Sequence, residues 1–285
     1  MNKSILATAA LAASAATALA ADLPSLKAPP PVYVPPPVIW TGFYVGLNAG
    51  YNFSSNNNNN LVTSAPLLPG AGIFTWALSA NAVLPAQNNG FIGGGQAGYN
   101  WQFARNFLVG VEADIQGVAA SGGSKAALTA VPFAATVFFT AYDARRNLDY
   151  LGTVRGRVGF LFTPTLLIYG TGGLAYGGIR NDLGLFQFST IAPFGVGASS
   201  SSDTRVGWTA GGGLEWMFWP NWSAKVEYLY YDLGRVTNAF ALIRVPPGIG
   251  LYAATQSADR FNGNIVRAGI NYHFNWGAAP ILASY

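Results

Sequence analysis

A single histidine and the absence of cysteine limit the reactions that this sequence could catalyse. His273 is the one histidine among 285 residues, and no cysteine is present. A protein zinc site takes several nitrogen or sulfur ligands, and a catalytic serine needs a base beside it, often on a Gly-x-Ser-x-Gly turn that this chain lacks. The sequence therefore predicts no enzyme and no metal site, and we expect His273 to be a hydrogen-bonded interior residue.

A glycine-rich run has the composition of a phosphate-binding loop without its pattern. Gly170-Thr171-Gly172-Gly173 is not followed by the Lys-Ser/Thr ending of such loops or by a helical pattern. We expect no cofactor, and these glycines more simply make room for large neighbouring side chains. Lysine and arginine form no run, so the sequence predicts no nucleic-acid binding either.

Eight charged residues lie on the polar side of segments in which polar and apolar residues alternate, four of each sign. Buried charges have to be paired, because an unpaired one costs several kcal/mol. Such a balance suits an interior better than a soluble exterior, which would carry a net excess. We therefore expect a lumen network of ion pairs formed by Glu112, Asp114, Arg155, Arg157, Glu215, Lys225, Glu227 and Arg267.

The alternation itself predicts strands, because successive side chains of a strand point to opposite faces. Eight segments show it, and each is long enough to cross a bilayer as a tilted strand. In the fourth segment, Leu148 and Tyr150 are assigned to the apolar face and Asp149 to the polar face. The segments are residues 40–53, 91–103, 107–116, 148–160, 166–178, 205–218, 222–230 and 264–274.

Short and long connections alternate between these segments. Short turns lie around Arg105, Pro164 and Pro220. Long connections are typical of the extracellular side of outer-membrane barrels, and short turns of the periplasmic side. The sequence therefore predicts an all-β fold, an eight-stranded antiparallel transmembrane up-and-down β-barrel over residues 40–274, with an extra hairpin near Val131–Thr140 left open. The long loops are expected at about 54–89, 118–147, 179–204 and 232–259.

The composition agrees with a membrane barrel and excludes other classes. Charged residues make up 9% of the chain, against about 25% in soluble domains, and 51% of residues are hydrophobic. The 35 glycines are too many for a helix bundle and follow no three-residue period, which excludes collagen. A soluble lipocalin-like ligand carrier would also alternate and stays the alternative fold, although its exterior should be more charged.

Both ends of the chain differ in composition from the barrel. Residues 1–20 have the basic start, apolar stretch and Ala-Leu-Ala cleavage site of a signal peptide, so we expect the mature chain to begin at Ala21. Residues 21–39 are predicted to form a proline-rich periplasmic segment. Residues 275–285 would be a periplasmic tail.

Aromatic residues gather at the predicted periplasmic strand ends, where a membrane interface favours them. The assembly signal for insertion is expected at Tyr272 and Phe274, or at Tyr285. The predicted periplasmic girdle consists of Trp40, Trp101, Phe103, Phe107, Phe160, Phe218, Trp222 and Phe274.

Several motifs of the chain resemble the small outer-membrane β-barrels of alphaproteobacteria called outer membrane immunogenic proteins, the porin-like Omp25/Omp31 group. The resemblance covers nearly the whole mature chain and implies an outer-membrane surface antigen with a role in envelope integrity or small-solute passage. The tail after Phe274 departs from the family, because it moves the terminal aromatic residue away from the last strand. The motifs are Ala21–Pro24, Trp40–Gly46, Gly98–Gln102, Tyr169–Gly173, Lys225–Gly234 and Gly269–Phe274.

The residues leave more than one function open. An eight-stranded barrel has an interior just wide enough for side chains to fill, so the charge network would plug it and the loops would serve as a surface antigen. The same charges could instead line a narrow pore for water and small ions. A barrel-embedded lipid-modifying enzyme is the least expected. The expected partners are the lipid bilayer and lipopolysaccharide, the barrel assembly machinery, and a host or extracellular ligand at the loops.

Overall fold

The computed structural model describes most of the predicted barrel and neither chain end. The described residues are 40–55, 58–64, 80–85, 89–120, 125–133, 135–190, 195–244 and 251–274. Within these ranges, no helix is long and apolar enough to cross a membrane. The predicted signal peptide, the proline-rich segment and the tail with Tyr285 lie outside the described residues.

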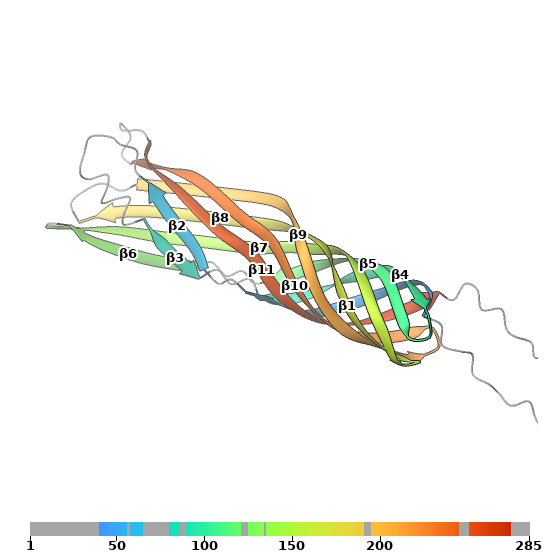
Figure 1. Cartoon of the computed structure of the whole chain (residues 1–285). Helices are drawn as coiled ribbons and strands as arrows, with labels where there is room; N and C mark the ends of the chain where they lie inside the picture. The colour runs from blue at the N-terminus through green and yellow to red at the C-terminus, as the bar shows by residue number, and fades with distance from the viewer. Residues whose placement is uncertain are drawn as a thin grey trace, which may run out of the picture. The chain divides into compact units, whose positions relative to one another are not determined.

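Eight antiparallel strands form a closed ring (Figure 1). The first strand pairs with the last from Phe43↔Phe274 to Ser54↔Gly263, and this closure gives the edge strands partners. The predicted eight-stranded antiparallel architecture is therefore confirmed. In ring order the strands are β1 (Gly42–Ser54), β4 (Gly90–Phe103), β5 (Phe107–Ala120), β7 (Thr136–Thr163), β8 (Leu166–Ser189), β9 (Gly195–Trp219), β10 (Trp222–Arg244) and β11 (Leu251–Phe274).

The period-two pattern separates an apolar exterior from a mostly polar interior. On β1, Val45 and Leu47 are exposed on the outside, while Tyr44 and Asn48 are buried inside. Glycine makes room for the large interior side chains. A Cβ on Gly98 would lie 2.5 Å from the ring carbon Cζ of Tyr44, so this ring needs a glycine on the neighbouring strand.

Five strands continue past the ring as an extension, and three short strands join them there (Figure 1). β6 (Lys125–Phe133) pairs with the start of β7, which forms the hairpin that the sequence left open. β2 (Asn58–Ser64) pairs with β11 and with β3 (Ala82–Pro85). The expectation that 118–147, 179–204 and 232–259 are loops is therefore wrong, because most of these residues belong to strands.

A register shift corrects the assignment of faces at the start of the predicted fourth segment. The pairing of β7 with β8 shifts between Leu148 and Tyr150, and such an irregularity reverses which face a residue occupies. Leu148 is 1% exposed and packs inside, whereas Asp149 is exposed. The predicted faces of Leu148 and Asp149 are therefore wrong, while Arg155 and Arg157 face the interior as expected.

Candidate functional site in the barrel interior

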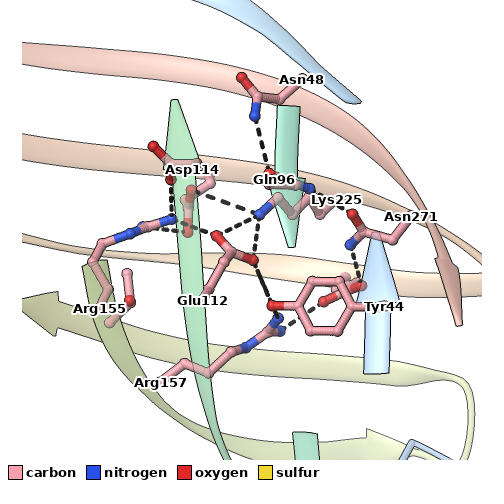
Figure 2. Close-up of polar contacts among 12 residues, drawn as sticks. Tyr44, Asn48, Gln96, Glu112, Asp114, Arg155, Arg157, Lys225 and Asn271 are labelled. Atoms are coloured by element: carbon pink, nitrogen blue, oxygen red, sulfur yellow. Dashed lines mark hydrogen bonds and ion pairs between the residues drawn. The ribbon is translucent and has the colours of Figure 1, made fainter. Parts of the chain in front are cut away.

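All eight charged residues that the sequence singled out are buried inside the barrel and contact one another. Figure 2 shows Glu112, Asp114, Arg155, Arg157 and Lys225 together. None of the eight is more than 5% exposed. They come from β5, β7, β9, β10 and β11, whose inward positions lie at similar heights in the paired register. The sequence distance between the partners shows that closure of the barrel, not local structure, brings them together.

Glu112 lies at the centre of this network. Lys225 Nζ is 2.9 Å from both of its carboxylate oxygens, and the Arg155 guanidinium contacts Oε1. Tyr44 donates a hydrogen bond of 2.6 Å to Oε2, and Arg157 Nη1 lies 3.6 Å from the same oxygen. Glu112 therefore balances several cations at once, which is what a buried carboxylate requires.

Two arginines share two carboxylates on one side of Glu112. Arg155 contacts Asp114 Oδ2 and Glu227 Oε1, each at 2.9 Å. Arg267 contacts the same two residues, at 2.9 Å from Asp114 Oδ2 and 2.6 Å from Glu227 Oε2. Charge-assisted bonds of this kind fix the positions of four strands relative to one another.

A second pair lies on the other side of Glu112. Arg157 Nη2 is 2.6 Å from Glu215 Oε2, and Nη1 donates to the Tyr44 hydroxyl at 2.9 Å. The same guanidinium lies 4.2 Å from the centroid of the Tyr169 ring, within cation–π range. Tyr44 and Tyr169 thus pack into the charge network, a role that the sequence did not assign to them.

Three amide side chains extend the network to β1 and β4, which carry none of the eight charges. Asn48 Nδ2 donates to Gln96 Oε1 at 3.0 Å, and Gln96 Nε2 donates to Asn271 Oδ1 at 2.5 Å. Asn271 Nδ2 donates to Glu215 Oε1 at 2.7 Å. These residues share the inward parity of the charged ones, and that parity was the signal that could have identified them.

His273 has a serine and a carboxylate beside it. Its Nε2 lies 2.9 Å from Ser223 Oγ and 3.4 Å from Glu215 Oε1, and Ser223 donates to the same Oε1 at 2.6 Å. In a catalytic triad the acid holds the ring nitrogen opposite the serine and the serine is accessible. Here the Ser223 hydroxyl and the Glu215 carboxylate both lie at Nε2 of His273, and Ser223 is completely buried. Within the described residues, no cluster of three or more potential ligands could hold a metal ion.

Layers of buried apolar residues lie on both sides of the charges. The turn-end layer lies near the short turns, and the loop-end layer lies toward the extension. The turn-end layer consists of Trp40, Leu108, Leu161, Leu167, Tyr169 and Met217. The loop-end layer consists of Ile92, Leu148, Leu151, Ala175, Ile179, Leu229, Tyr231, Leu233, Val236, Phe261 and Ile265.

Most of the predicted girdle residues lie outside the barrel near the short turns. Trp101 is 57% exposed, and Phe107 packs edge-on against Phe160 with ring centroids 5.4 Å apart. Trp40 is an exception, and its assignment to the girdle is wrong. It is 1% exposed, donates from Nε1 to the Pro164 carbonyl at 2.9 Å and belongs to the turn-end layer. It precedes β1, so strand parity does not determine its direction.

Comparison with known proteins places this architecture in a family. The family described as "Outer membrane protein beta-barrel domain" matches residues 5–274. The chain belongs to this outer-membrane barrel family. Its relatives include the 31 kDa outer-membrane immunogenic protein of Brucella melitensis, which is 32% identical over 95% of this chain and 100% of the relative. The 25 kDa outer-membrane immunogenic protein of Brucella abortus is 27% identical over 95% of this chain and 97% of the relative.

Solved structures with similar strands are also outer-membrane proteins. OprG from Pseudomonas aeruginosa has a TM-score of 0.42 at 10% identity, covering 83% of this chain and 99% of its own. Ail of Yersinia pestis has a TM-score of 0.28 at 13% identity, covering 81% and 99%. The family match, and not these scores, locates this barrel in the outer membrane.

Proposed function

We propose that this outer-membrane barrel is a closed structural and surface protein whose lumen does not conduct. The observation that carries the proposal is the filling of the interior by two apolar layers with an ion-pair network between them. The interior of an eight-stranded barrel is about the width that side chains can fill. The alternative, a narrow pore, would need a continuous polar path past both layers.

The network itself supports a plug rather than a conducting lining. Its four carboxylates and four cations balance, and Lys225, Arg155 and Arg267 are each held by two or more carboxylates. A passing ion would have to separate these pairs inside the buried interior, where breaking one costs about 3–5 kcal/mol. The eight charged side chains therefore link the strands to one another across the interior.

The proposal extends to the partners of the barrel. The apolar exterior faces lipid, and the girdle residues other than Trp40 anchor the turn end at the membrane interface. Tyr272 and Phe274, on the strand that closes the ring, act as the assembly signal for the barrel assembly machinery. The extension faces the cell exterior, where it contacts lipopolysaccharide and acts as a surface antigen. Signal peptidase releases the chain at Ala21, which the intact mass of the mature protein tests.

Planar-bilayer recording tests whether the lumen conducts. The purified, refolded protein is added to bilayers in concentrated potassium chloride, and a general porin inserted under the same conditions shows that the bilayer reports channels. A heat-dependent shift on an unboiled gel shows that the barrel is folded. We expect no steady single-channel openings from the folded protein, and steady openings would support the pore instead.

A further inference from the structure

We propose that a pocket on the outer face of the extension binds an uncharged saccharide. The pocket has a volume of about 450 Å³ and lies over β7, β8 and β9. Its walls include Asp143, Arg145, Asp182 and Ser200. The volume falls within the range of small-molecule sites, roughly 300–1,000 Å³. This inference rests on the proposed function only in placing the extension outside the cell.

The floor of the pocket exists because two neighbouring outward positions carry almost no side chain. Gly184 on β8 pairs with Asp143 on β7 and with Ala198 on β9. One register step away, Asp182 pairs with Arg145 and with Ser200. Larger side chains therefore rise around a hollow at Gly184 and Ala198.

The walls present a hydrogen-bond donor opposite an acceptor. Asp182 and Arg145 face each other across the strands, yet the Arg145 side chain forms no hydrogen bond or ion pair with any residue that the structure describes. Asp182 accepts a hydrogen bond of 2.6 Å from Ser200 Oγ, which orients the carboxylate. A ligand that bridges these walls must donate and accept at adjacent atoms, as vicinal hydroxyl groups do.

The charge balance argues for an uncharged ligand. Arg145 and Asp182 bring one charge of each sign to the pocket, so a sulfated or phosphorylated polymer would meet a carboxylate beside the guanidinium and gain no net attraction. A bare cation would have Arg145 as a neighbour, which disfavours it for the same reason. An uncharged sugar is not subject to either of these electrostatic effects.

An aromatic platform borders the pocket on the same face. Phe186 lies two residues beyond Gly184 on β8 and is 42% exposed. Its ring packs on Phe188 at 5.9 Å between centroids, and Phe188 stacks on Phe139 at 5.0 Å. The negative face of an aromatic ring attracts the C–H face of a pyranose. The polar walls can form hydrogen bonds with sugar hydroxyl groups, and the exposed ring beside them can contact the C–H face of the sugar. Sugar recognition combines these two kinds of contact.

Saturation-transfer NMR on the full-length protein in lipid nanodiscs tests the proposal. The probes are the methyl glycosides of glucose, galactose, mannose and N-acetylglucosamine, together with a heparin fragment, glycine and calcium as competitors. Polysaccharide released from the bacterium's own lipopolysaccharide forms one further arm, and a mucin-type host glycan forms another, so the two arms separate the sources. We expect saturation transfer to at least one neutral glycoside and no competition by the heparin fragment, glycine or calcium.

Filling the pocket provides the decisive variant. A Cβ on Gly184 would lie 3.8 Å from its nearest neighbours, an ordinary contact, so Gly184→Leu should fold and occupy the hollow. We expect at least a tenfold loss of affinity in Gly184→Leu and no change in Thr204→Leu, an exposed control on β9. The heat-dependent gel shift verifies that both variants fold.

Absence of transfer to every saccharide, unchanged binding in a folded Gly184→Leu, or binding of only heparin, glycine or calcium would each overturn the proposal. If Gly184→Leu does not fold, Arg145→Ala takes its place with the same expectation, because Arg145 is an exposed residue of the pocket wall. Bilayer conductance is unaffected by this pocket, so failure here is distinguishable from failure of the closed-barrel proposal.

Discussion

Removing one carboxylate from the interior network tests whether its charges balance as the structure indicates. Glu112→Gln keeps the shape of the side chain and removes one negative charge from a set of four acids and four bases. Lys225 then has Glu227 as its remaining carboxylate, at 4.0 Å. The network then carries one uncompensated positive charge in the buried interior.

The expected cost follows from that uncompensated charge. Breaking a buried pair from one side costs about 3–5 kcal/mol, or roughly two to four orders of magnitude in the folding equilibrium constant. With a urea dependence of about 2–3 kcal/mol per molar, the midpoint should fall by about 1 to 2.5 M. The assay is urea unfolding of the protein in lipid vesicles, followed by the fraction that keeps its folded mobility on an unboiled gel.

The double variant Glu112→Gln/Lys225→Met separates charge balance from loss of contacts. It removes one charge of each sign, so it should be more stable than the sum of the two single variants by roughly 2–3 kcal/mol. Asp203→Asn is the matched control, because Asp203 is exposed and lies 3.6 Å from Arg205, and it should cost less than about 1 kcal/mol. A Glu112→Gln midpoint close to that of the wild type, or strictly additive single variants, would refute the reasoning.

Two further predictions concern packing and the membrane. Gly98→Ala should lower stability by about 1–3 kcal/mol in the urea assay, because its Cβ would lie 2.6 Å from the Val111 carbonyl oxygen. In the control Gly170→Ala the Cβ would lie 3.9 Å from the Gly211 oxygen, so stability should change by less than about 0.5 kcal/mol. Equal effects would contradict this account of the glycines. Val154→Lys, on the exterior midway along the membrane segment of β7, should cost about 2–4 kcal/mol in vesicles, and Ser202→Lys on the extension about 0–1 kcal/mol. A harmless Val154→Lys would place that face in water.

The sequence allowed the charged site to be predicted better than the lengths of the strands. Within the membrane one face of each strand meets lipid and the other faces the barrel interior. A period of two in the polarity of the residues therefore assigns Glu112, Arg155 and Lys225 to the interior directly. Beyond the membrane the outward face meets water instead of lipid, while the inward face still packs around a buried core. Both faces there carry small and polar residues, so the contrast between them fades. The run Ser199–Ser202 on β9 shows this, since neighbours on opposite faces are the same residue.

Other errors have equally local causes. The pairing shift between Leu148 and Tyr150 changes the face of Leu148 without any mark in the composition of the segment. Trp40 precedes the first strand, so its direction depends on the barrel end that it covers and on the Pro164 carbonyl that it contacts. Ser223 shared the inward face with His273, but the height at which the two meet depends on the register of β10 with β11.

The difference between a plug and a pore is visible along a single strand once its inward face is known. The inward residues of β10 run from Ser223 through Lys225 and Glu227 to Leu229, Tyr231 and Leu233. A conducting lining would stay polar from one end to the other, because an ion cannot lose its hydration against leucine without replacement ligands. The change from charged to apolar at Leu229 occurs where β4, β7, β8 and β11 also contribute apolar side chains. Apolar residues on the inward parity of several strands, rather than the charges among them, are therefore the sequence feature that separates the two functions.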